Sequence, residues 1–464
     1  MSSVSSSKII KFCHLKNQFL AVICANLACV AHGGSSGWLS PALLVLQSDS
    51  TPLINGPINN EMASWLGASA YIGGFCGNFI FMAILRYFGR KKTFCVLALP
   101  NLAFWITVTI TTRIELLCLG RFLAGLSCGG TFVCVPLFVA EIADDHIRGV
   151  LGSFLIISTC FGVMISYIAG AYLTYSTTPY VIMIFPIAFT ISFLLLPESP
   201  NDLMKQKRFD DAAKSLRFYK NCYKDTKEEN ERFLKEWDNV ELIARQSLDR
   251  GEKVSLGDFC TQEARIGLLK AFCIIGLNLF SGSAVLMNYA TIIFKDSGSK
   301  LDPSLSSIIM ITIQLIATTI STTLIDNVGR RFLLIVSSLG TSIGLSMMGA
   351  YAYLSYNKYE LDGYDWVPVT SISFCVFMAY IGLVPLLFVL LMEVLPVKIR
   401  SLGTSYCLLL VSVFLFTIVK FYPTLAAIIH LHWCMWIFSA ISVLGVLFGL
   451  FMLEETKGKN INVE

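Results

Sequence analysis

Long apolar runs separated by short polar segments dominate this chain. Runs of about 20 mostly apolar residues, the length that crosses a bilayer as a helix, recur twelve times, six on either side of a polar stretch at 201–265. Backbone groups inside a bilayer must satisfy their hydrogen bonds internally, so such runs predict helices. The sequence therefore predicts an all-α membrane protein with twelve transmembrane helices in two six-helix bundles, joined by a cytosolic helical segment. The runs lie at 18–46, 62–85, 94–112, 114–140, 148–173, 179–196, 266–294, 303–325, 332–356, 366–392, 401–424 and 431–453.

Each half of the sequence contains the same two clusters of charged residues. Charges at the edges of apolar runs are costly unless they pair or function, and matched charges in duplicated halves are typical of two-bundle transporters. We expect the two sets to bind each other when the transporter faces outward and to separate when it faces inward. The alternative is that the basic residues only mark the inner membrane edge. The repeated residues are Gly89-Arg90 and Gly329-Arg330, which lie 240 positions apart, and Glu141 with Arg148 and Glu393 with Arg400, which lie 252 apart.

The distribution of lysine and arginine predicts the orientation. If both termini are cytoplasmic, the short inner segments hold 14 basic residues and the outer segments five, namely Arg113, Lys295, Lys300, Lys358 and Lys420. The formal net charge of +4 is thus an effect of topology and gives no indication of nucleic-acid binding.

The polar stretch holds 14 basic and 14 acidic residues. Leu203, Ala212, Leu216 and Tyr219 recur within it near helical spacing, which predicts short amphipathic helices against the inner face of the bundles. About 65 residues with few apolar ones are too few for an enzymatic domain. The predicted division is a first bundle at 1–200, an intracellular segment at 201–265, and a second bundle with its tail at 266–464.

Several polar residues lie inside the apolar runs. His32 is either a solute contact or a hydrogen-bonded interior histidine, and Arg121 is expected to bind carbonyl groups or a neighbouring helix. The amides of Asn278, Asn288 and Gln314 either join helices or face a wet cavity. The first run contains no Asp or Glu, which favours passive transport over proton coupling, with His32 as the remaining titrating group. No run carries a nucleophile–base pair or a metal-ligand cluster, so neither an enzyme nor a cofactor is expected.

Local motifs extend this pattern along nearly the whole chain. They are SPAL at 40–43, GRFLAG at 120–125, a P-x-F-x-x-E segment that ends at Glu141, PESP at 197–200, LIDNVGRR at 324–331 and ETKGK at 455–459. In order and spacing they resemble the sugar porter branch of the major facilitator superfamily, most closely the insect facilitated trehalose transporters. The resemblance implies a monomeric plasma-membrane carrier of a small solute, gated by Arg90, Glu141, Arg148, Glu198, Asp326, Arg330, Glu393 and Arg400.

The departures from the family pattern concern the solute site. Arg86 stands where the family has an acidic residue, and Ile156 where a sugar-binding glutamine is usual. Arg86 lies among other basic residues, so we expect repulsion to weaken the first-half gate. Hexose hydroxyls need buried donors and acceptors, so the site should suit an ordinary glucose carrier poorly. The remaining candidates for solute contacts are Asn278, Ser283, Asn288, Gln314 and Phe388.

Two functions remain open from the sequence. The first is facilitative transport of a sugar, either trehalose or a hexose, or of a related small polyol by alternating access. The second is a membrane solute sensor that does not transport, which Arg86 and the lost amides favour. The retained gating charges favour the transporter, because an immobile receptor needs no cycling gate.

Overall fold

The computed structural model describes residues 2–144, 147–223, 227–249, 256–396, 399–453 and 455, without the side chains of residues 2–14, 326, 400 and a few others. Every regular element in this part of the chain is helical. The first half comprises α1 (Ser2–Gly37), α2 (Leu39–Leu46), α3 (Asn60–Phe88), α4 (Arg90–Ile110), α5 (Ile114–Ile142), α6 (Arg148–Tyr172), α7 (Thr178–Ile182) and α8 (Ile184–Leu195).

The remaining helices form the polar stretch and the second half. The polar stretch holds α9 (Pro200–Lys205), α10 (Phe209–Lys220), α11 (Lys227–Asp249) and the short 3₁₀ turn η1 (Leu256–Cys260). The second half comprises α12 (Gln262–Phe280), α13 (Ser283–Asp296), α14 (Pro303–Val328), α15 (Arg330–Tyr356), α16 (Val367–Met378), the π-helical turn η2 (Ala379–Leu383), α17 (Val384–Val394) and α18 (Arg400–Phe451).

The described helices confirm the predicted all-α membrane fold. Eleven helical segments of the described chain are long and apolar enough to span a membrane, and the last, Leu402–Phe451, has 50 residues. At about 1.5 Å per residue, this segment is about 75 Å long, more than twice what a bilayer core of about 30 Å requires. It is broken at His430, whose φ of 66° and ψ of 162° are not helical. The segment therefore supplies the last two of twelve spans.

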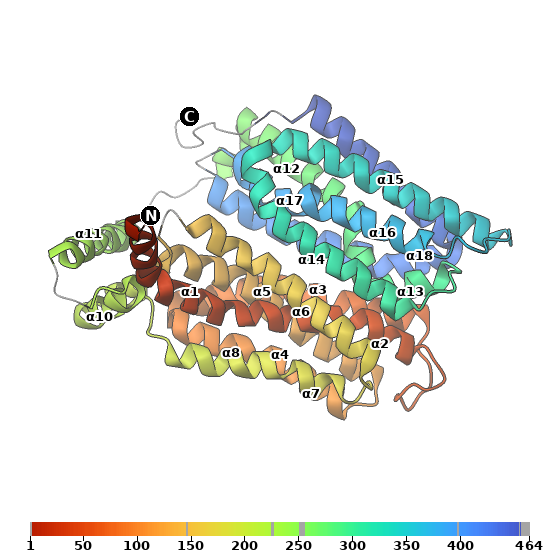
Figure 1. The fold of residues 1–464 in the computed structure, drawn as a ribbon, viewed down its shortest axis with the longest axis horizontal. Coiled ribbons are helices and arrows are strands. Elements are labelled where there is room, and N and C mark those ends of the chain that lie inside the picture. Colours follow the sequence, from red (N-terminus) through yellow and green to blue (C-terminus); the bar gives the residue numbers. More distant parts are fainter. Residues whose placement is uncertain are drawn as a thin grey trace.

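The two halves form separate bundles that lie side by side (Figure 1). We call the end with the turns at Gly89 and Gly329 and with helices α9 to α11 the basic end, and the other the opposite end. Within the first bundle α3 packs closely on α5, because Gly73 and Gly125 let the two backbones approach. Small residues at such contacts are typical of packed membrane helices.

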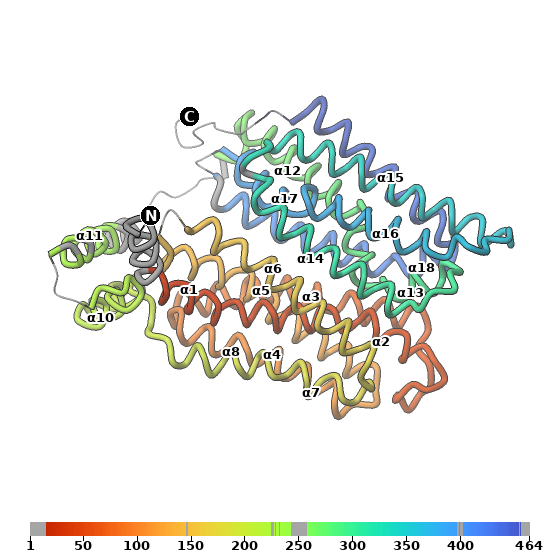
Figure 2. The backbone as a smooth tube through the Cα atoms, in the orientation of Figure 1, coloured from red at the N-terminus to blue at the C-terminus, as the bar shows by residue number. Residues whose placement is uncertain are grey.

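The halves share one hydrophobic core at the opposite end and have separate cores at the basic end. The shared core joins Leu43 and Trp105 of the first half to Ile293 and Val419 of the second. Helix α2 packs there against α13, and α3 against α18, while α6 packs against α14. Figure 2 shows α2 and α13 together at the end away from α10 and α11. At the basic end each bundle has a core of its own.

Helices α9 to α11 confirm the predicted amphipathic segment. Leu203, Ala212 and Leu216 are buried together with Val240 of α11. Tyr219 instead enters the core of the first bundle at its basic end. Burial raises the pKa of Tyr219, so its hydroxyl stays protonated and donates to the carbonyl of Pro197 at 2.7 Å.

Candidate functional site

The first-half charge cluster lies where α4, α5 and α9 meet at the basic end. Arg90 forms an ion pair with Glu141, and its Nη1 lies 2.9 Å from Oδ1 of Asp202. The Arg90 and Glu141 side chains are each 13% exposed. Ser199 adds a hydrogen bond to Oε2 of Glu141 at 2.7 Å. The chain thus surrounds one largely buried guanidinium with two carboxylates, an arrangement of charge-assisted hydrogen bonds.

The second half repeats this arrangement at Gly329-Arg330. Nε of Arg330 lies 3.3 Å from Oε1 of Glu393, and its backbone N–H donates to Glu455 at 3.0 Å. Arg331 donates its own backbone N–H to Glu455 at 3.2 Å. Each Arg-Glu pair therefore lies within a single half of the protein, one pair in each half. The predicted contact between the sets of the two halves belongs to the state that closes the basic end, and it stays a prediction.

The other predicted gating residues lie around these two clusters. Arg148 begins α6 at the basic end with an exposed side chain, and the described partners of Glu141 are Arg90 and Ser199. Glu198 accepts from Gln206 at 3.4 Å and lies 3.8 Å from Arg208. The side chains of Asp326 and Arg400 lie outside the described part, so their predicted contacts stay open.

A third charged cluster at the basic end was missed from the sequence. Lys220 of α10 is 5% exposed and binds Asp144 at 2.5 Å and Glu236 of α11 at 3.0 Å. Gln18 of α1 exchanges two hydrogen bonds of 3.0 Å with Asp144, one to its carboxylate and one from its backbone N–H. These contacts fasten α10 and α11 to the first bundle. The sequence did not reveal these contacts, because a segment with equal numbers of acidic and basic residues gives no indication of which charges are buried.

Two of the predicted solute-contact amides lie at the interface between the halves. Asn288 of α13 donates to the hydroxyl of Tyr71 of α3 at 2.8 Å. Gln314 of α14 donates to Sγ of Cys160 of α6 at 3.4 Å. Both amides are buried, at 5% and 1% exposed. The chain thus places hydrogen-bonding groups of both bundles against each other beside the shared core, which includes Tyr289 next to Asn288 and Ala317 one turn from Gln314.

The remaining predicted contacts lie within the second bundle. Asn278 donates to the carbonyl of Leu383 in the π-helical turn η2, and Ser283 donates to the carbonyl of Asn278 at 3.4 Å. Phe388 is half-buried on α17. The side-chain amide of Asn278 therefore already has a hydrogen-bond acceptor in this conformation, and this bond joins α12 to η2.

Sequence patterns did not reveal the tyrosines of the interface. Tyr167 of α6 donates to the carbonyl of Met287 of α13 at 2.7 Å, and Tyr380 lies 3.7 Å from the sulfur of the same methionine. Ser40 and Thr291 bring their hydroxyl oxygens to 2.6 Å at the opposite end. Tyrosine and serine inside apolar runs look like ordinary helix-packing residues until the helices are placed in space.

The two polar residues expected inside first-half runs are both buried. Arg121 donates to the carbonyls of Ser35 at 2.6 Å and Leu66 at 3.3 Å, which confirms the predicted binding to carbonyls. Nε2 of His32 lies 3.3 Å from Sγ of Cys128, while Nδ1 has no hydrogen-bond partner. His32 is therefore a buried, partly bonded histidine.

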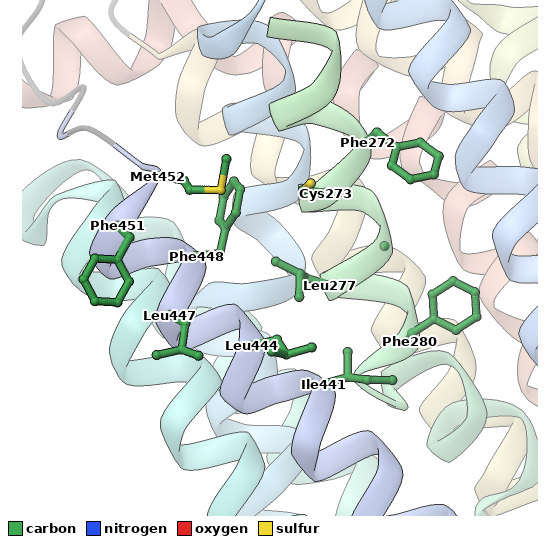
Figure 3. Close-up of a pocket in the computed structure, with 11 residues that line it drawn as sticks. Phe272, Cys273, Leu277, Phe280, Ile441, Leu444, Leu447, Phe448, Phe451 and Met452 are labelled. Carbon is green, nitrogen blue, oxygen red and sulfur yellow. The ribbon is translucent and has the colours of Figure 1, made fainter. Parts of the chain in front are cut away.

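The structure holds a wide surface pocket of about 540 Å³ on the outside of the second bundle, between α12 and α18. Figure 3 shows its lining, in which Phe272, Leu277 and Phe448 belong to an entirely apolar set. Such a wall offers no hydrogen bonds to a polar solute and suits lipid chains. Among the described residues, no cluster of three His, Cys, Asp or Glu could hold a metal ion.

Comparisons with known proteins agree with this architecture. The facilitated trehalose transporter Tret1 of Bombyx mori is 30% identical over 454 residues, which cover 96% of this chain and 86% of that protein. Tret1 of Culex quinquefasciatus is 28% identical over 450 residues, covering 96% and 84%.

Solved structures of the xylose transporter XylE from E. coli share the fold. Its inward open conformation gives a TM-score of 0.76 at 21% identity and covers 96% of this chain and 98% of that one. The partially occluded inward open conformation gives 0.74 at 20% identity, with 96% and 99% covered.

The family match extends over almost the whole chain. The family model described as "Sugar (and other) transporter" matches residues 22–463, so it includes both charge clusters and both bundles. The match confirms the resemblance noted in the sequence, makes the chain a transporter and not an enzyme, and gives the sensor hypothesis no support. This multi-pass membrane protein belongs to the sugar (and other) transporter family.

Proposed function

We propose that the chain carries a sugar, either trehalose or a hexose, or a related small polyol, down its gradient by alternating access. The main support for this proposal is that buried hydrogen-bonding side chains of both halves meet at their interface, as Asn288 and Tyr71 do at 2.8 Å. A solute held there would replace contacts between the halves with contacts to itself. Solute binding would then shift the equilibrium between the state closed at one end and the state closed at the other.

The arrangement of cores supports an inward-facing state for this structure. We propose that the basic end is cytoplasmic, with both termini, because the positive residues gather there. The halves are then closed toward the outside by their shared core and divided toward the cytoplasm, where each bundle has its own core. We further propose that the division at 201–265 separates two bundles that rock as units within one monomer in the plasma membrane.

Passive transport is supported by the composition of the first span. Leu15–Leu46 contains no Asp or Glu. A proton-coupled carrier usually carries an ionisable residue on its pathway, and the candidate there is His32. We therefore propose that the sugar equilibrates across the membrane and does not accumulate.

A flux experiment tests this function. Cells that lack their own sugar carriers would express the chain, and uptake of labelled trehalose, glucose, other hexoses and polyols would be measured. We expect saturable uptake of at least one sugar that stops at equal internal and external concentrations and is insensitive to a protonophore. Accumulation that a protonophore abolishes would contradict passive transport, and no flux of any of these solutes at normal surface expression would overturn the proposal.

A further inference from the structure

Lys420 lies inside a membrane helix and contacts the other half of the protein. The sequence counts it with the outer segments, near the end of the run 401–424, and the structure places it within α18 with a half-buried side chain. Its Nζ lies 2.7 Å from Oγ of Ser64 and 4.2 Å from the ring centroid of Trp65. Both partners belong to α3 of the first half, so one lysine makes two contacts across the interface.

The local chemistry suits an ammonium group. Ser64 donates its own hydroxyl hydrogen to the carbonyl of Glu61 at 2.6 Å, which leaves its oxygen lone pairs for Lys420. The Trp65 ring presents its electron-rich face, the preferred aromatic surface for a cation. No ion pair between Lys420 and a carboxylate occurs among the described residues. All of the polar stabilisation seen for this charge therefore comes from across the interface.

The contact belongs to the closed opposite end. Phe416, one helical turn before Lys420, packs on the same Trp65 ring at a centroid distance of 6.4 Å. Val419, next to Lys420, is fully buried in the core that the halves share. When α3 and α18 separate at this end, Lys420 loses both of its partners together.

We propose that Lys420 is a gating residue whose contact with Ser64 and Trp65 holds the opposite end closed and breaks each time that end opens. A charge that has its partners only in one conformation biases the equilibrium toward that conformation. The inference rests on the alternating-access part of the proposed function, and it does not depend on which solute is carried.

A cysteine reporter measures opening of this end directly. Ala63 of α3 is 2% exposed and lines a pocket of about 380 Å³ between the halves, opposite Tyr289 and Tyr422. Ala63→Cys would be introduced into the full chain, purified in detergent, and its labelling rate by a polar maleimide corrected for the same protein without the reporter. Lys420→Met should raise this rate roughly tenfold, because it removes both a charged hydrogen bond and a cation–π contact. Lys420→Arg should stay near the reference rate, because arginine keeps the charge and also stacks on aromatic faces.

Two further variants complete the test. Trp65→Leu should raise the labelling rate severalfold with Lys420 intact, and it carries the test if Lys420→Met does not yield folded protein. Lys295→Met is the matched control. This exposed lysine lies in the last turn of α13, so its replacement should leave the labelling rate unchanged. Reference-rate labelling in both Lys420→Met and Trp65→Leu would overturn the gating role. If these variants label faster but the protein transports none of the tested sugars, the gating role of Lys420 is supported and the proposed function is rejected.

Discussion

Arg90 and Glu141 form an ion pair that joins α4 to α5 at the basic end of the first bundle. Its counterpart, Arg330 with Glu393, joins α15 to α17 in the second bundle. The duplication read from the sequence therefore corresponds to a physical unit that is built twice. In this conformation each unit holds its own bundle together, as expected for rigid halves that move against each other.

Asp202 is the residue whose removal should weaken the first unit most clearly. It is 4% exposed and accepts hydrogen bonds from both the backbone and the guanidinium of Arg90. Asp202→Asn should lower the stability of the purified protein by about 1.5–3 kcal/mol, the usual loss for a hydrogen bond to a charged group. Thermal unfolding in detergent measures this, and an unchanged midpoint would show that Asp202 is dispensable.

Arg86→Asp provides the contrasting case. The sequence interpretation was that repulsion among basic residues weakens the first-half gate. In the described state Arg90 already lies between two carboxylates and Arg86 is exposed, so the weakening of the gate in the outward-facing state stays a prediction. Exposed charge changes contribute little, about 0–1 kcal/mol. We therefore expect Arg86→Asp to leave both flux and unfolding midpoint close to the reference.

Glu393→Gln tests the corresponding unit in the second half. The Glu393 side chain is 6% exposed, and the change leaves Arg330 without that carboxylate. Losing one partner of a buried ion pair costs about 3–5 kcal/mol, and the 16% exposure of Arg330 lowers this somewhat. We expect flux to fall at least fivefold while the protein still reaches the membrane. Normal flux at normal surface expression would exclude a gating role for Glu393.

The fold could be predicted from the sequence because a bilayer leaves few choices. Long apolar runs must become helices, and basic residues mark one end of them. The partners of individual side chains could not be predicted in the same way. Asp202, Tyr71 and Lys420 gain their meaning only from helices that are distant in sequence, and no periodicity connects them. Lys420 was counted with the outer segments because it lies near the outer end of the apolar run 401–424, whereas α18 places it in a helix that contacts α3.

Asn288 should contribute directly to solute affinity. Its amide meets Tyr71 across the interface, and it has a second hydrogen bond to the carbonyl of Ala284 at 2.8 Å. Asn288→Ala should raise KM for the transported sugar about tenfold, since a lost polar contact in a buried site costs about 1–3 kcal/mol. Asn357→Ala, an exposed asparagine that also bonds a carbonyl of its own helix, is the control and should keep the reference KM. An unchanged KM in Asn288→Ala would limit this residue to helix packing.

Gly67 should be the position on α3 where the opposite end is least tolerant of added volume. A Cβ there would lie 2.8 Å from the Tyr289 hydroxyl and 3.0 Å from Val419, both of the second half. Tyr289 cannot move away easily, because it is buried and its hydroxyl donates to the carbonyl of Val419 at 2.9 Å. Gly67→Ala should therefore destabilise the closed opposite end by about 1–3 kcal/mol, the usual cost of overpacking.

The matched control for this change lies two turns further along the same helix. A Cβ at Gly74 would meet only the carbonyl oxygen of Gly125 at 3.7 Å, an ordinary contact within the first bundle. Labelling of Ala63→Cys should accelerate in Gly67→Ala and stay at the reference rate in Gly74→Ala, because only the first added methyl lies between the halves. If both variants label alike, the approach of α3 to α18 at Gly67 does not limit opening of this end.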